Sequence, residues 1–136
     1  MNQTEVQAFI EGLKNVQQTE NFGYLFYFVG DDHLLPFTTI ANTDNDYDSI
    51  SNLNREGVFR INIGVSRKTF DKLIPQYDPE TIDHSQLNTI LPHPDYAKQN
   101  FLCILNPSGE NVATTKELIQ EAHSIAAVRF QRKTKN

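Results

Sequence analysis

One histidine in this chain stands in a setting that could do chemistry. His93 lies between Pro92 and Pro94 and is followed by Asp95 and Tyr96. The prolines stiffen the backbone and could hold the imidazole in one orientation, and a nearby carboxylate could fix its tautomer. We expect a binding site that includes His93 and Tyr96, or a catalytic site where His93 is general acid or base and Asp95 or another carboxylate orients it. The simpler alternative is a loop histidine that packs or caps at the surface.

A second pair of polar residues falls on the most regular strand pattern. Over residues 57–65 apolar and polar side chains alternate, and Arg60 and Asn62 point to the face opposite the apolar one. If that face is the floor of a cleft, the planar guanidinium could bind a carboxylate or phosphate. If it is solvated, both are ordinary exposed strand residues. The candidate ligand-binding residues are Arg60, Asn62, His93 and Tyr96.

The sequence lacks the familiar metal, nucleophile and cofactor signatures. Residues 44–48 carry acids at alternate positions, but Ser49 and Arg55 stand where a calcium loop needs Gly and Glu. No ligand spacing typical of a metal site occurs, and neither does a nucleotide fingerprint or phosphate loop. Cys103 lies in an apolar segment, where burial favours an inert thiol. We therefore predict no metal and no cofactor.

The other histidines and the basic residues have simpler explanations. His33 falls in a turn, His84 in an irregular segment, and His123 at the edge of the last helix's apolar stripe. Basic residues gather in residues 55–72 and in the tail, and could make a phosphate-facing patch. The net charge of −5, however, makes a nucleic-acid partner the weakest of the alternatives.

Length and composition predict one domain. The 136 residues are 38% hydrophobic and 21% charged, which suffices for a core without a disulfide. One cysteine fits a reducing compartment, and no targeting signal or bilayer-length apolar run is visible, so we expect a cytoplasmic protein with no membrane contact. The domain should cover residues 1–136, with residues 131–136 as a frayed cationic tail.

The hydrophobic pattern predicts an α+β two-layer sandwich. Capping boxes at residues 4–7 and 114–117 mark helix starts. Helices are expected over residues 4–16, 66–74 and 114–130, and strands over residues 22–29, 36–41, 57–65 and 101–105. The order is α-β-β-β-α-β-α, which favours an antiparallel sheet with helices on one face. Residues 22–29 are apolar on both faces, which also allows a homodimer.

Three stretches resemble a known family. They are residues 57–65 (GVFRINIGV), residues 92–96 (PHPDY), and residues 105–108 together with Ala122 and His123. They are similar to a mostly bacterial family of small proteins catalogued only as a domain of unknown function. The carboxyl half also resembles, distantly, the MmcQ/YjbR-like fold. Neither group has an established activity, so the resemblance implies a fold and no function.

Three functions remain open, in order. The first is a non-enzymatic domain that binds an unknown small ligand or protein. The second is a small hydrolase or transferase that uses His93 as general acid or base. The third is weak nucleic-acid binding through residues 55–72 and the tail.

Overall fold

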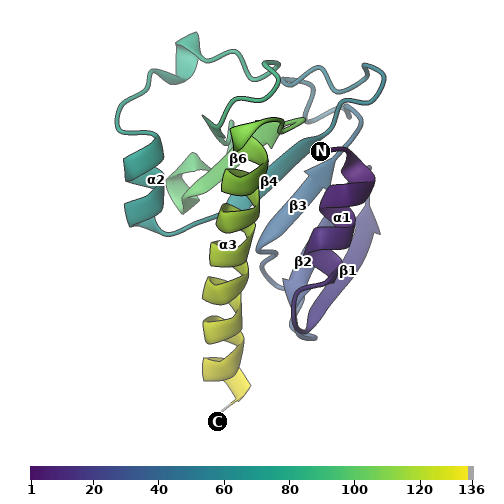
Figure 1. Cartoon of the computed structure of the whole chain (residues 1–136), viewed down its shortest axis with the longest axis vertical. Coiled ribbons are helices and arrows are strands. Elements are labelled where there is room, and N and C mark those ends of the chain that lie inside the picture. Colours follow the sequence, from purple (N-terminus) through teal and green to yellow (C-terminus); the bar gives the residue numbers. More distant parts are fainter. Residues whose placement is uncertain (135–136) are drawn as a thin grey trace.

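The computed structural model describes residues 1–134 of the chain and has three helices and a six-stranded antiparallel sheet. The strands lie in the order β1-β2-β3-β4-β6-β5. The helices are α1 (Gln3–Glu11), α2 (Arg67–Leu73) and α3 (Glu110–Thr134), and the strands are β1 (Val16–Asn21), β2 (Tyr24–Val29), β3 (Thr38–Ala41), β4 (Arg60–Gly64), β5 (Leu91–Pro92) and β6 (Phe101–Leu105). Two short 3-10 turns, η1 (Pro79–Thr81) and η2 (Ala97–Gln99), interrupt the irregular segment (Figure 1). The predicted α+β class with an antiparallel sheet is confirmed.

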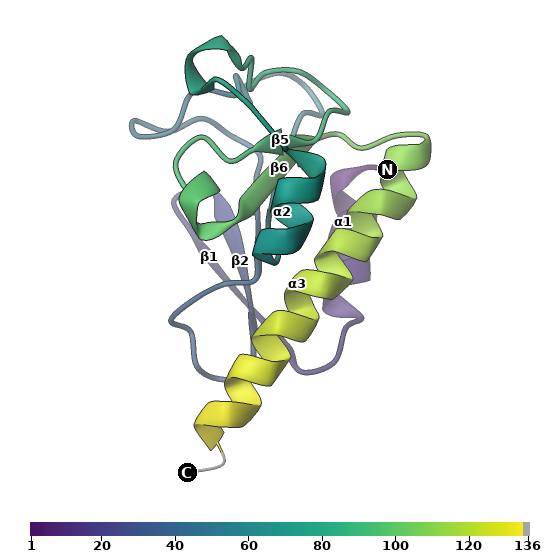
Figure 2. The ribbon, with the colours of Figure 1, turned by 90° about the vertical axis from the view of Figure 1, so that its left-hand side faces the viewer.

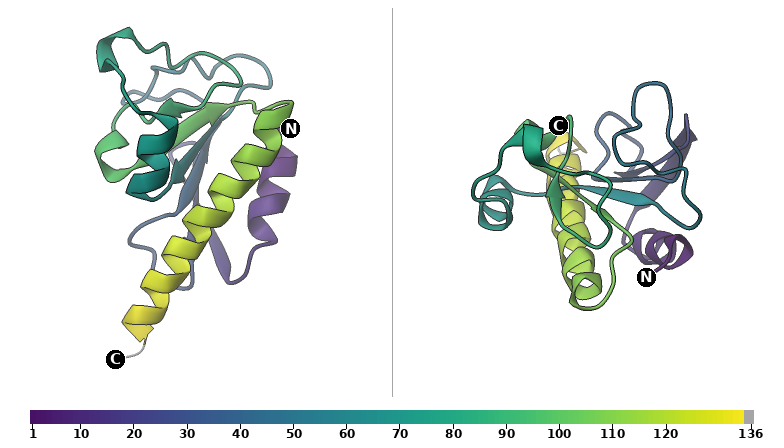
Figure 3. Two further views of the ribbon diagram at one scale, coloured as in Figure 1. Left: turned by 60° about the vertical axis from the view of Figure 1, so that its left-hand side comes forward. Right: turned by 90° about the horizontal axis from the view of Figure 1, so that it is seen from above.

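The three helices pack against one face of the sheet (Figures 2 and 3). Because side chains alternate along a strand, one face of the sheet collects the apolar residues of β2, β3, β4 and β6. They form a single core cluster with one side of each helix. Its central members are Val6, Ile10, Tyr27, Ile40, Ile61, Ile63, Phe70, Leu102, Ile104 and Ile119. No helix within the described residues is long and apolar enough to cross a membrane.

The opposite face of the sheet carries the polar candidates. The register places Phe26 opposite Thr39, Thr39 opposite Asn62, and Asn62 opposite Cys103, so these four side chains form one row across β2, β3, β4 and β6. The long loop between β3 and β4 folds over one end of this face, and its Leu53 is buried in a small second cluster. This face is therefore only partly covered.

Both expected capping boxes are wrong in position. α1 is capped by Asn2, whose side chain accepts a hydrogen bond from the Glu5 amide at 2.9 Å, while the Glu5 carboxylate accepts from the Asn2 amide at 3.1 Å. An Asn-x-x-Glu box two residues earlier thus replaces the one expected at Thr4. α3 begins at Glu110, directly after the turn, and Thr114 lies inside it with its hydroxyl 3.4 Å from the Glu110 carbonyl.

Two strands were not predicted, and the ends of the first and last helices differ from those expected. The first helix ends at Glu11 and not at residue 16, and β1 begins at Val16 and runs through residues that we assigned to no element. β1 is polar because it is an exposed edge strand, so its pattern carries no apolar alternation; Phe22 and Gly23, both at positive φ, turn it into β2. The two-residue β5 is too short to show a period. α3 continues to Thr134, through most of the expected frayed tail, and residues 135–136 lie outside the described residues.

Gly30 links the sheet to the far end of α3 and offers a test of this packing. Its φ is +75°, and a Cβ built there would lie 2.3 Å from the Phe130 ring. Gly57 has a similar φ of +73° but open space around it. We expect Gly57→Ala to lower the free energy of unfolding by about 1 kcal/mol, from the left-handed backbone alone. Gly30→Ala should cost about 1–3 kcal/mol more, because the methyl displaces Phe130.

Urea unfolding of both variants, alone and combined with Phe130→Ala, measures this difference. In the Phe130→Ala background the two glycine substitutions should cost about the same. If Gly30→Ala still costs more there, the contact with α3 is not the cause.

Candidate functional site

A cleft of about 490 Å³ opens on the sheet face that the helices leave free. Its floor is formed by Thr39 of β3 with Arg60 and Asn62 of β4. Aromatic side chains of β2 stand on one side, and those of β6 and the preceding loop stand on the other. Three strand spacings separate β2 from β6, which makes the cleft about 14 Å across at the backbone. The full lining is Tyr24, Phe26, Leu35, Pro36, Thr39, Tyr47, Asp48, Arg60, Asn62, His93, Asp95, Tyr96, Gln99 and Phe101.

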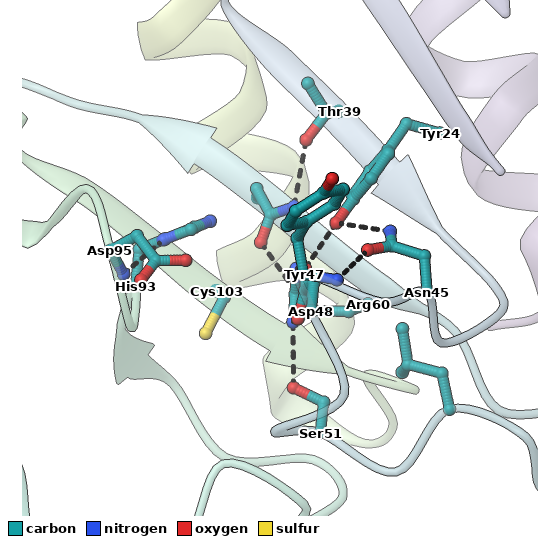
Figure 4. Close-up of polar contacts among 12 residues, drawn as sticks. Tyr24, Thr39, Asn45, Tyr47, Asp48, Ser51, Arg60, His93, Asp95 and Cys103 are labelled. Atoms are coloured by element: carbon teal, nitrogen blue, oxygen red, sulfur yellow. Dashed lines mark hydrogen bonds and ion pairs between the residues drawn. The ribbon is translucent and has the colours of Figure 1, made fainter. Parts of the chain in front are cut away.

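Arg60 is the centre of the polar floor. Although it is charged, its exposed fraction is 0%, and Asn62 is 2% exposed, so the expectation of ordinary solvated residues is wrong at both positions. The two terminal nitrogens of the guanidinium each donate to one carboxylate oxygen of Asp48. Nη1 also donates to the Ser51 hydroxyl at 2.9 Å. The Arg60 Nε donates to the Asn62 side-chain oxygen at 3.0 Å. Figure 4 shows Arg60 beside Asp48 and Ser51. The planar fork we expected to bind a ligand anion is thus occupied by the protein's own carboxylate.

Asp48 receives a second donor from the sheet. The Tyr24 hydroxyl donates to the carboxylate oxygen that also accepts from Arg60, and the Asn45 amide lies 3.3 Å from the Tyr24 oxygen. Burial alone would raise the pKa of Asp48, but the hydrogen bonds from Arg60 and Tyr24 outweigh it and lower that pKa below its usual value. The pKa of Tyr24 is raised, first by burial and then by this hydrogen bond. Arg60 and Asp48 therefore form a charged pair whose net charge is zero.

His93 is held by the backbone rather than by a carboxylate. Its Nδ1 accepts two hydrogen bonds, from the amides of Asp95 and Tyr96, each at 3.0 Å. The imidazole is 6% exposed, and burial, with a smaller contribution from the positive charge of Arg60, lowers its pKa to about 3. The ring is therefore neutral near pH 7, with its proton on Nε2. In Figure 4 this second nitrogen points toward the Arg60 cluster.

The expected partnership of His93 with the Asp95 carboxylate is not present. Asp95 is exposed at the rim of the cleft, and within residues 1–134 its carboxylate makes no hydrogen bond to the imidazole. The reason is local geometry: after Pro94 the chain turns so that amides, not side chains, meet Nδ1. Tyr96 stands at the rim, half exposed, with its ring 5.0 Å from His93 and 6.4 Å from Phe101.

Phe101 completes this aromatic wall because Gly64 lets it lie against the sheet. A Cβ at Gly64 would come within 2.9 Å of the Phe101 ring, so any larger residue would push the ring up. On the β2 side, Tyr24 and Phe26 have ring centres 5.8 Å apart. The cleft thus has a polar floor between two apolar walls, which is the usual composition of small-molecule sites.

The structure brings Arg60, Asn62, His93 and Tyr96 together around one cleft, although the first two come from strand β4 and the other two from a distant loop. Apart from Asp95, sequence reasoning missed the other lining residues, and four of them shape the floor and the walls. Thr39, Tyr24 and Phe101 were assigned only to strands, and Asp48 only to a solvated acidic loop. The one available signal was Arg60 itself, because a cation on a strand face that carries no carboxylate needs one from elsewhere if that face is buried.

The other histidines lie outside the cleft. His33 stacks on Phe28 with ring centres 4.6 Å apart, and His123 bonds the Lys14 carbonyl at 2.7 Å on the helix side. His84 is buried, with Nε2 2.9 Å from the Pro92 carbonyl. In the described part of the chain no group of three or more His, Cys, Asp or Glu side chains is placed to hold a metal ion.

The basic residues are largely occupied within the protein. Arg55 donates to the backbone carbonyls of Ser51, Asn52 and Ser85 and so ties two loops together. Arg67 pairs with Asp71 on α2 at 3.2 Å. Arg60, being buried, is not part of an exposed basic surface, whereas Arg67, Lys68 and Lys72 are exposed on α2.

We predict that the Arg60–Asp48 pair contributes strongly to stability. Asp48→Asn removes the negative charge and leaves a fully buried guanidinium without a counter-charge, which should lower the free energy of unfolding by about 3–5 kcal/mol. Asp71→Asn breaks a pair whose partners are both more than half exposed and should cost less than about 1 kcal/mol. Chemical denaturation of the two variants gives the comparison. Equal losses would mean that the buried pair has no special weight.

His93 should make stability depend on pH. The unfolded histidine has a pKa near 6.5 and the folded one about 3, so below pH 6.5 the unfolded state binds a proton that the folded state does not. The contribution is fully present above pH 6.5 and is lost as pH falls toward 3, by up to about 1.4 kcal/mol per pH unit. Asp48, with its lowered pKa, adds a loss only below about pH 4.

His93→Asn isolates this effect, because an Asn oxygen can accept from the same two amides but does not titrate. Unfolding curves between pH 7 and 4.5 should show a clearly flatter dependence for the variant than for the parent. Parallel curves would contradict the buried neutral histidine.

A protein family described as a family of unknown function (DUF6194) matches residues 1–135. The match spans nearly the whole chain, so the chain belongs to this family, and the predicted membership of a family of unknown function is confirmed. No curated protein and no solved structure matches the chain at a significant level. The distant relation to the MmcQ/YjbR-like fold and a bacterial origin stay predictions.

Proposed function

We propose that this DUF6194 protein is a ligand-binding domain, and that the cleft between β2 and β6 takes a small organic molecule. The proposal rests on one observation: the residues selected from the sequence lie together in space. Arg60, Asn62, His93 and Tyr96 were selected from the sequence for their chemistry, and they line a single cleft of about 490 Å³. Its volume and its apolar walls over a few polar groups match those of small-molecule sites.

The cleft is also preorganised. Arg60 holds Asn62 on one side and the Asp48 loop on the other, and two backbone amides hold His93. A ligand entering such a site would find its polar partners already oriented, so little ordering entropy would be lost on binding. A surface that merely happens to be hollow would not need a buried charged network beneath it.

The same geometry argues for binding over catalysis. A general base near pH 7 needs a free lone pair and a pKa near the working pH. His93 has its Nδ1 lone pair engaged by two amides and a pKa of about 3, and its Nε2 carries the proton. Cys103, on the same sheet face, is fully buried, and burial raises its pKa to about 12, so it offers no thiolate.

Binding at this cleft can be tested with a library of small aromatic and heterocyclic compounds. Amide spectra of 15N-labelled protein should show shifts that cluster at Thr39, Asn62 and the 93–101 segment. Tyr96→Ala removes an exposed wall residue and should lower the affinity of the bound compounds about five- to tenfold, as expected for one aromatic contact.

Tyr77→Ala is the matched control, since Tyr77 has similar exposure but lies outside the cleft. Its effect on affinity should be negligible. The proposal fails if the compounds shift no amide. It also fails if the shifted amides lie away from the cleft and Tyr96→Ala does not change the affinity.

A further inference from the structure

The chemical class of the ligand can be read from the hydrogen atoms that the floor leaves free, and this step rests on the proposed function. Arg60 Nε can only donate, so the Asn62 atom 3.0 Å away must be its carbonyl oxygen. The amide nitrogen of Asn62 then faces Thr39, 2.9 Å from the hydroxyl oxygen. One of its two hydrogens is used there, and the other has no recorded partner among residues 1–134.

Thr39 and His93 also have free donor hydrogens, because their acceptor atoms are already engaged. The Thr39 oxygen accepts from Asn62, and its own hydrogen bonds to none of the described residues. His93 accepts twice at Nδ1, so the neutral ring carries its hydrogen on Nε2, which likewise has no recorded partner in the described chain. Thr39 of β3, Asn62 of β4 and His93 of the 93–96 turn thus each leave a donor hydrogen at the cleft.

The strong acceptors of the floor are already engaged. Both oxygens of Asp48 accept from Arg60, and one accepts from Tyr24 as well. The Asn62 oxygen accepts from Arg60. A ligand that brought its own donors to the floor would therefore find these acceptors taken, and burying an unpaired donor is costly.

The charges at the cleft disfavour an ionic ligand. The cation of Arg60 is matched by the bidentate Asp48, His93 is neutral, and the remaining charge at the cleft is the exposed Asp95. An anion would lose its hydration without gaining a free counter-charge. A cation would meet the donor hydrogens of the floor.

We propose that the cleft recognises an uncharged, planar compound through an acceptor oxygen, as in a ketone or amide carbonyl. The oxygen would sit over Thr39 and Asn62 within reach of His93 Nε2. The flat body would lie between the walls formed by Phe26 and by Tyr96 with Phe101. Buried donors that are left unsatisfied by a competing compound supply the discrimination.

Four small probes of similar size test this: acetophenone, ethylbenzene, benzoate and benzylamine. Titration into 15N-labelled protein gives a dissociation constant for each from the shifts of cleft amides. Acetophenone should bind about tenfold more tightly than ethylbenzene, and more tightly than either ion. His93→Asn keeps the turn but removes the Nε2 donor, so acetophenone should lose about three- to tenfold in affinity while ethylbenzene is unaffected.

His33→Asn makes the same chemical change outside the cleft and should leave all four constants unchanged. Thr39→Val, which deletes the hydroxyl, should reduce the preference for acetophenone in the same way as His93→Asn. Each other outcome is decisive. Equal binding of acetophenone and ethylbenzene overturns the acceptor rule while leaving the binding site intact. Tighter binding of benzoate or benzylamine overturns the requirement for an uncharged ligand. If no probe shifts a cleft amide, the proposed binding function itself fails.

Discussion

A buried arginine beneath the free face of the sheet is the constraint on which the rest of this site depends. A guanidinium with no exposed surface is tolerable only if a counter-charge and acceptors are brought to it. The protein meets this need by folding the β3–β4 loop back so that Asp48 and Ser51 reach Arg60. That loop then covers one end of the sheet face, and the other end is left as the cleft. The position of the loop and the neutrality of the floor thus follow from one ion pair.

The turn around His93 keeps a buried imidazole neutral and in one orientation. An imidazole close to Arg60 cannot easily carry a positive charge, and its burial disfavours the charge further. Two backbone amides donate hydrogen bonds to Nδ1 of the neutral ring and so fix its tautomer. The proton is therefore on Nε2, and the ring presents a donor to the cleft. The proline on either side of His93 limits the conformations of this turn. In this way a residue type usually associated with proton transfer becomes a fixed polar anchor.

Much of the fold, and some of the site, could be predicted from the sequence. The alternating pattern of residues 57–65 shows its period directly, whereas the polar edge strand β1 shows none, and its residues 17–21 were assigned to no element. Arg60, Asn62, His93 and Tyr96 were identified because their residue types and local spacing are unusual. Asp48 was not, since an acid in a polar loop looks solvated until the fold brings it to Arg60. The same limit applies to Asp95, whose amide and not its carboxylate contacts His93, a distinction that only backbone geometry can make.

The order of the strands has a consequence for how the chain acquires its structure. β1 to β4 form a simple meander, and every contact of the polar floor lies within this first part of the chain, with Arg60 and Asp48 only 12 residues apart. β4 gains its second neighbour only when β6 inserts beside it, and the 93–101 wall arrives in the same event. During synthesis from the amino terminus, the first half would therefore emerge with β4 as a temporary open edge. The same β6 that covers this edge also carries the second wall of the cleft, so the site is complete only when the carboxyl-terminal part of the chain has joined the sheet.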